Sequence, residues 1–130
     1  AGLVGAGVLF WTAGFDILYA FQDVAVYRRE GLRSVPARLG TRAARWIAVG
    51  CHLVTGVLLA AAILYNHRPG GEDVLGEGSA LALETIVLAL AIQHVRLRRA
   101  GADRIARAFL PMNAMVSLIW LGGVVYDVAT

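Results

Sequence analysis

Four long apolar stretches constrain the fold of this chain more than any other feature of its sequence. They lie at about residues 1–20, 46–65, 80–95 and 108–126. A helix needs about 20 mostly apolar residues to cross a bilayer. Inside lipid, a helix satisfies all of its backbone hydrogen bonds internally. We therefore expect an all-α fold, namely a transmembrane helical bundle with four spans.

The overall composition supports a membrane location. Of the 130 residues, 58% are hydrophobic and 16% are charged, whereas soluble domains have about 45–50% apolar and about 25% charged residues. A chain this short has too little interior volume to bury so many apolar side chains away from water. The single cysteine, Cys51, lies in an apolar run and cannot form an internal disulfide, so we assign it no role.

The basic residues, all of them arginines, fall almost entirely in alternate connections. The connection after the first stretch contains Arg28, Arg29, Arg33, Arg38, Arg42 and Arg45, and the third contains Arg96, Arg98, Arg99, Arg104 and Arg107. The second connection instead has Arg68 beside Glu72, Asp73 and Glu77. The positive-inside rule places arginine-rich connections on the cytoplasmic side. We predict a multi-pass protein of the inner (plasma) membrane, with these loops and any site beside them cytoplasmic, and no nucleic-acid partner.

Two acidic residues lie at the end of the first stretch. Asp16 and Asp23 are seven residues apart, so on one continuous helix they would share a face, with Tyr19 close to it. A carboxylate below the membrane surface is costly and usually faces the bundle interior or a wet cavity. Two carboxylates on one face suit a divalent cation, which prefers oxygen ligands. The alternative is that they only cap or anchor the cytoplasmic end of the helix.

An arginine-rich segment with Gly and Pro follows these acids directly. Arg28, Arg33 and Arg38 would suit a phosphate or diphosphate group, because guanidinium forks bind phosphate oxygens and a neighbouring metal would bridge others. The competing interpretation is that these arginines only set the topology and contact lipid headgroups.

The segments 14–23 (GFDILYAFQD) and 28–40 (RREGLRSVPARLG) together resemble the second aspartate-rich motif and the following loop of UbiA-type membrane prenyltransferases. The resemblance is greatest to the branch that prenylates 4-hydroxybenzoate or a related aromatic acid in ubiquinone or menaquinone biosynthesis. A weaker likeness continues to the last span, so the resemblance covers residues 1–130 as one partial domain. It implies the C-terminal half of a fold of roughly nine spans, each of bilayer-crossing length.

The resemblance also implies an activity and its residues. Family members transfer a polyprenyl group from a polyprenyl diphosphate to an acceptor, here an aromatic acid, with the help of Mg²⁺. It assigns Asp16 and Asp23 as catalytic residues and metal ligands. It assigns roles in substrate binding or loop closure to the motif surroundings, namely Tyr19, Arg28, Arg33, Ser34 and Arg38.

Two departures from the family pattern limit this prediction. The family motif has a second aspartate four residues after the first, whereas this chain has Tyr27, and a phenol is a poor magnesium ligand at neutral pH. The first aspartate-rich motif and the preceding helices are absent from this sequence, so we expect this chain to be inactive without the missing N-terminal half. The alternatives are a non-catalytic four-span scaffold or half-transporter, and a decayed prenyltransferase paralogue.

Other polar residues lie within the apolar stretches. Glu84 either lines a cavity or reaches water near the outer interface, and the sequence leaves both open. We expect His52 to hydrogen-bond between helices and His94 to be interfacial, because no histidine cluster has the spacing of a metal site.

Overall fold

The structure of the protein is a computed structural model that describes residues 2–70, 74–99 and 102–130. No side chain from residue 99 to residue 110 is described. Glu72 and Asp73, two of the acids in the second connection, therefore lie outside the described residues. The same is true of the side chains of Arg99, Arg104 and Arg107.

Every regular element in the described ranges is an α-helix. The helices are α1 (Gly2–Tyr19), α2 (Val24–Arg29), α3 (Val35–Asn66), α4 (Glu77–Arg99) and α5 (Ala102–Ala129). All except α2 are long and apolar enough to cross a membrane. The predicted all-α bundle with four transmembrane spans is confirmed.

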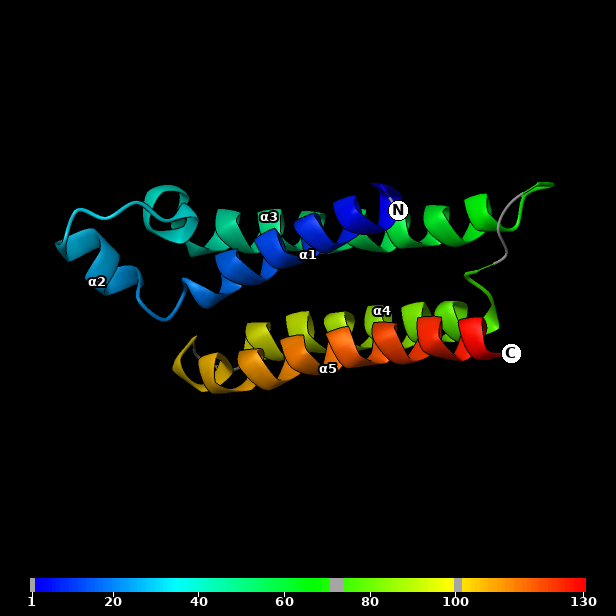
Figure 1. The fold of residues 1–130 in the computed structure, drawn as a ribbon. Coiled ribbons are helices and arrows are strands. Elements are labelled where there is room, and N and C mark those ends of the chain that lie inside the picture. Colours follow the sequence, from blue (N-terminus) through cyan, green and yellow to red (C-terminus); the bar gives the residue numbers. More distant parts are fainter. Residues whose placement is uncertain (1, 71–73, 100–101) are drawn as a thin grey trace.

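The four long helices form two hairpins, α1 with α3 and α4 with α5, which lie alongside one another (Figure 1). The chain reverses direction at each connection. The two arginine-rich connections consequently lie at one end of the bundle, and the connection between α3 and α4 lies at the other end with the C-terminus (Figure 1). Among the described side chains, the arginines of the first connection, together with Arg96 and Arg98, thus lie at the opposite end from Glu77.

Helix α3 begins well before the predicted start at residue 46. Ser34 caps it, since its hydroxyl oxygen accepts a hydrogen bond from the backbone N–H of Ala37 at 3.2 Å, and Pro36 lies in the first turn, where proline is favoured. Gly40 adopts a φ of 83° and kinks the helix. The arginine-rich segment before residue 46, predicted as a loop, is therefore partly helical, because its Ala, Arg and Leu residues are good helix formers.

Glycine allows α1 and α3 to pack closely. A Cβ atom at Gly14 would lie 2.5 Å from His52 Nε2 on α3, and one at Gly7 would lie 3.1 Å from a methyl group of Leu59. Small residues at such contacts let membrane helices approach one another. Phe15 and Leu18, on the same side of α1, are buried against this contact. The face of α1 that carries Asp16 points away from it.

Candidate functional site

The structure corrects the predicted relationship between Asp16 and Asp23. Helix α1 ends at Tyr19, and a turn separates it from α2, which begins at Val24. The two aspartates are therefore not on one helical face. Helical spacing holds only along an unbroken helix, and this one stops between them.

Both carboxylates nevertheless lie on the surface at the arginine-rich end of the bundle. The side chains of Asp16, Tyr19 and Asp23 are all exposed. Asp23 occupies the N-cap position of α2, but its side chain makes no capping hydrogen bond. Its carboxylate oxygens therefore do not cap the helix that follows. Tyr27 is half-buried and donates its backbone N–H to the carbonyl oxygen of Asp23 at 2.8 Å.

The predicted phosphate-binding residues have different surroundings. Arg28 donates a hydrogen bond from Nε to the carbonyl oxygen of Ala37 at 3.3 Å, which links α2 to the start of α3. Ser34 caps α3, as described above. Arg33 and Arg38 are exposed. The structure thus gives Arg28 and Ser34 local structural contacts and leaves Arg33 and Arg38 facing outward.

A divalent cation would find oxygen ligands here, but not a full set. Among the side chains that the structure describes, in residues 2–70, 74–98 and 111–130, no three of His, Cys, Asp or Glu gather closely enough to hold a metal ion. Carboxylate oxygens are the ligands that Mg²⁺ prefers, and it commonly takes one or two of them together with water and substrate phosphate oxygens. The donor chemistry of Asp16 and Asp23 therefore fits a magnesium ion that is shared with a diphosphate.

An apolar cavity of about 240 Å³ lies deeper in the bundle, where all four long helices meet. It is lined by Val8, Trp11, Thr55, Leu59, Ile86, Val116, Ser117 and Trp120. Trp11 and Asp16 are five residues apart on α1, so the cavity begins about 7 Å along the helix axis from the aspartate. The same helix carries a carboxylate at the arginine-rich end and a tryptophan in the apolar interior.

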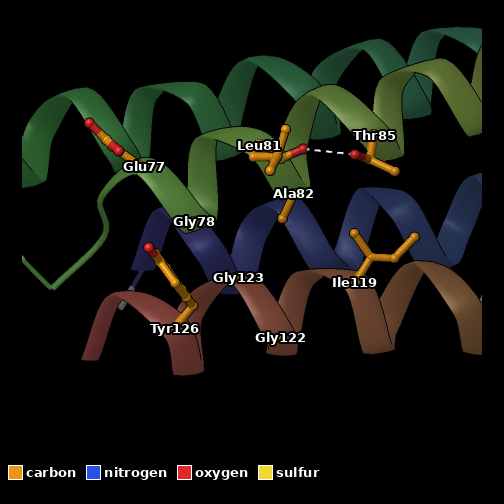
Figure 2. A pocket seen from close by; sticks show the side chains of 9 residues that line it. All are labelled: Glu77, Gly78, Leu81, Ala82, Thr85, Ile119, Gly122, Gly123 and Tyr126. Carbon is orange, nitrogen blue, oxygen red and sulfur yellow. Dashed lines mark hydrogen bonds between the residues drawn. The ribbon is translucent and has the colours of Figure 1, made fainter. Parts of the chain in front are cut away.

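A second hollow, of about 470 Å³, lies between α4 and α5 at the opposite end of the bundle (Figure 2). Glu77 and Tyr126 border it, whereas Thr85 bonds to the carbonyl oxygen of Leu81 in its own helix at 2.9 Å. Because the arginines lie at the other end, this hollow does not belong to the predicted diphosphate site.

Comparison with known protein families matches residues 1–120 to the UbiA prenyltransferase family. The chain belongs to this family. The match covers the first three spans, part of the fourth and the segment with Asp16 and Asp23, in agreement with the resemblance seen in the sequence. Membership of the UbiA family accounts for the helical membrane bundle. It does not select the 4-hydroxybenzoate branch.

Among characterised proteins, this UbiA family chain is similar to a C(50) beta-cyclic carotenoids biosynthesis protein, LbtBC, of Dietzia sp. (strain CQ4). The two are 41% identical over 54 residues, which cover 42% of this chain and 12% of that protein. No solved structure matches the chain significantly.

Two polar contacts between helices stand out besides the predicted site. Nδ1 of His52 and Nε2 of His94 are 2.9 Å apart, which confirms the predicted interhelical hydrogen bond of His52 and gives it a partner on α4. Asp127 on α5 accepts hydrogen bonds at the start of α4, and sequence reasoning missed it. The signal that could have found Asp127 is an acid at the end of an apolar stretch. Glu84 was singled out as an acid inside such a stretch, and its side chain is exposed on α4.

Proposed function

We propose that this chain forms part of a membrane prenyltransferase that takes a polyprenyl group from a polyprenyl diphosphate. Asp16 and Asp23 would hold Mg²⁺, and Arg33 and Arg38 would bind the diphosphate, with Arg28 and Ser34 fixing the loop. The observation that carries the proposal is the grouping of the exposed residues Asp16, Asp23, Arg33 and Arg38 at one end of a bundle that has an apolar cavity in its interior. A diphosphate and its apolar chain need a charged end and an apolar interior in the same bundle.

Each part of this arrangement has a chemical task. Bound Mg²⁺ would supply a Lewis acid that stabilises the negative charge of the departing diphosphate. The guanidinium groups would add charge-assisted hydrogen bonds to the same phosphate oxygens. The apolar side chains around Trp11 would surround the hydrocarbon chain and keep water away from the allylic cation that forms when the C–O bond breaks. Tyr19, exposed one turn beyond Asp16, would lie beside the diphosphate.

The carboxylates described here are too few for the full site, so we propose that further spans complete it. The family's first aspartate-rich motif, carried by these spans, would face Asp16 and Asp23 and bind the remaining metal positions. Tyr27 stands where the family motif has a carboxylate, which would make the completed site more dependent on that opposing motif. By the positive-inside rule, the arginine-rich end and the diphosphate site face the cytoplasm across the plasma membrane.

Two acceptors are consistent with this arrangement. The segment 31–36 (GLRSVP) resembles the quinone branch and favours an aromatic acid such as 4-hydroxybenzoate. The similarity to a carotenoid biosynthesis protein instead favours a carotenoid.

Membranes containing the complete enzyme, incubated with Mg²⁺ and a labelled polyprenyl diphosphate, provide the test. One sample receives a carotenoid and another receives 4-hydroxybenzoate, and the labelled products are separated by chromatography. We expect Mg²⁺-dependent labelling of the carotenoid. Labelling of 4-hydroxybenzoate alone would select the quinone branch. Transfer to neither, with diphosphate binding also absent, would support a non-catalytic scaffold or a decayed paralogue.

A further inference from the structure

A groove of about 490 Å³ runs between α3 and α4, where the two hairpins meet. Much of its lining is apolar, including Leu53 and Val57 from α3 and Val87 from α4. Its polar lining residues are His52, His94 and Arg98, of which His94 and Arg98 lie in the last turns of α4, at the arginine-rich end. Neither Asp16 nor Asp23 lines it, so the groove is separate from the proposed prenyl-transfer site.

The arginine-rich end of the groove is positively charged. The Arg98 guanidinium lies 5.6 Å from the centre of the Trp46 ring, across the gap between the two helices. Arg45 precedes Val49 by one helical turn on the stripe of α3 that lines the groove. No aspartate or glutamate is among the lining residues that the structure describes.

These basic groups have unused hydrogen-bonding capacity. Nε of Arg45 and Nδ1 of His94 are buried from solvent, and neither has a hydrogen-bond partner among the described side chains. Because water cannot reach these two atoms, a lipid phosphate cannot bond to them directly, and Arg45 acts on a ligand through its charge. The positive charge of Arg45 and Arg98 favours a negatively charged ligand at this end.

The depth of the groove identifies the kind of anion. Tryptophan is enriched at the level of the lipid headgroups, and Trp46 is 58% exposed beside Arg98. Below this level the groove continues along side chains that match lipid acyl chains in polarity. Basic pockets between transmembrane helices are typical binding sites for anionic lipid headgroups.

We propose that this groove binds one anionic phospholipid. Its phosphate lies against Arg98 and Arg45, and one acyl chain lies along Leu53, Val57 and Val87. A zwitterionic lipid binds less well, because its own cation would face the two guanidinium groups. The bound lipid joins the two hairpins in addition to the hydrogen bond between His52 and His94.

The headgroup contact is tested with the chain in phosphatidylcholine nanodiscs, with or without phosphatidylglycerol. Native mass spectrometry measures the phosphatidylglycerol that the protein retains. Arg98→Gln is expected to lower the retained amount about fivefold, the effect of one arginine near the membrane surface. Arg96→Gln is the matched control, because Arg96 is exposed on the same helix and does not line the groove. Equal retention by the two variants would overturn the proposal.

The acyl-chain contact is tested separately at Gly56. A Cβ atom there would lie 3.8 Å from a methyl group of Val87, so Gly56→Leu fills the groove without touching the arginines. Gly50→Leu is its control, because a Cβ atom at Gly50 meets no atom within 4 Å. We expect only Gly56→Leu to lose phosphatidylglycerol. Full displacement of the retained phosphatidylglycerol by glycerol phosphate, which has no acyl chain, would overturn the proposal. So would efficient cross-linking of Leu53→Cys between two copies, which would show a second chain in the groove.

Discussion

Ser79, in the first turn of α4, donates both its backbone N–H, at 2.7 Å, and its hydroxyl hydrogen to Oδ2 of Asp127 on α5. Gly76 and Gly78 also donate their backbone N–H groups to this carboxylate at 2.7 Å. The first amides of a helix have no partner within the helix, and a negative charge there is favoured by the helix dipole. Asp127 therefore ties the second hairpin together at the end remote from the arginines.

Asp127→Asn should lower the unfolding temperature of the purified protein by several degrees. The exchange removes the charge and replaces one acceptor oxygen with a donor that would face backbone N–H groups. Ser79→Ala, which removes one of four donors, should cause a smaller decrease. The measurement is thermal unfolding in detergent followed by circular dichroism. An Asp127→Asn variant as stable as the unchanged protein would show that the carboxylate contributes little.

Gly14→Ala should destabilise the contact between α1 and α3 by about 1–3 kcal/mol, as expected for overpacking of a tight site. The added Cβ atom would lie 2.5 Å from His52 Nε2 and 3.2 Å from Cys51 Cβ. His52 cannot swing away without losing its hydrogen bond to His94. Unfolding in mixed micelles measures the change.

Gly5→Ala is the control for this exchange, because a Cβ atom at Gly5 meets no atom within 4 Å. It should leave stability unchanged or raise it by up to about 1 kcal/mol through better helix propensity. Equal changes in stability for Gly14→Ala and Gly5→Ala would contradict the close approach of α1 and α3 at Gly14.

Ser34 allows the capping and substrate-binding roles to be separated. Ser34→Ala should cost about 1 kcal/mol of stability, the usual contribution of an N-cap hydroxyl. Ser34→Asp keeps the cap and should restore stability, but its charge should weaken the binding of a polyprenyl diphosphate. Stability is measured by unfolding, and binding by displacement of a fluorescent diphosphate. Unweakened diphosphate binding by Ser34→Asp would show that Ser34 only caps the helix.

The membrane bundle could be predicted because hydropathy and arginine placement are properties of whole segments. Twenty apolar residues specify a span whichever neighbour it packs against, so the four spans were found with modest errors at their ends. The early start of α3 was not predicted, because the arginines before residue 46 are typical of a connecting loop. Ser34 and Pro36 form a helix start signal that outweighs that composition.

The details of the site could be predicted only in part. The residue types singled out Asp16, Asp23, Arg28, Arg33 and Arg38, and these five lie at one end of the bundle. The prediction that Asp16 and Asp23 share one helical face was wrong, because helical periodicity requires an unbroken helix and α1 ends at Tyr19. The partnership of Asp127 with Ser79 was not predictable from spacing, because the two residues are far apart in the sequence and meet only through the hairpin.

The most direct test of the central claim is the Mg²⁺-dependent prenyl transfer of an Asp23→Asn variant of the complete enzyme that carries this chain. Transfer should fall by at least about a hundredfold, comparable to losing a major electrostatic contact in an active site. Glu30→Gln is the matched control, because Glu30 is an exposed acid in the same segment that pairs only weakly with Arg29, at 3.3 Å. It should keep near-normal activity. If Asp23→Asn turns over as fast as Glu30→Gln at every Mg²⁺ concentration, Asp23 is not a metal ligand and the proposed site is wrong.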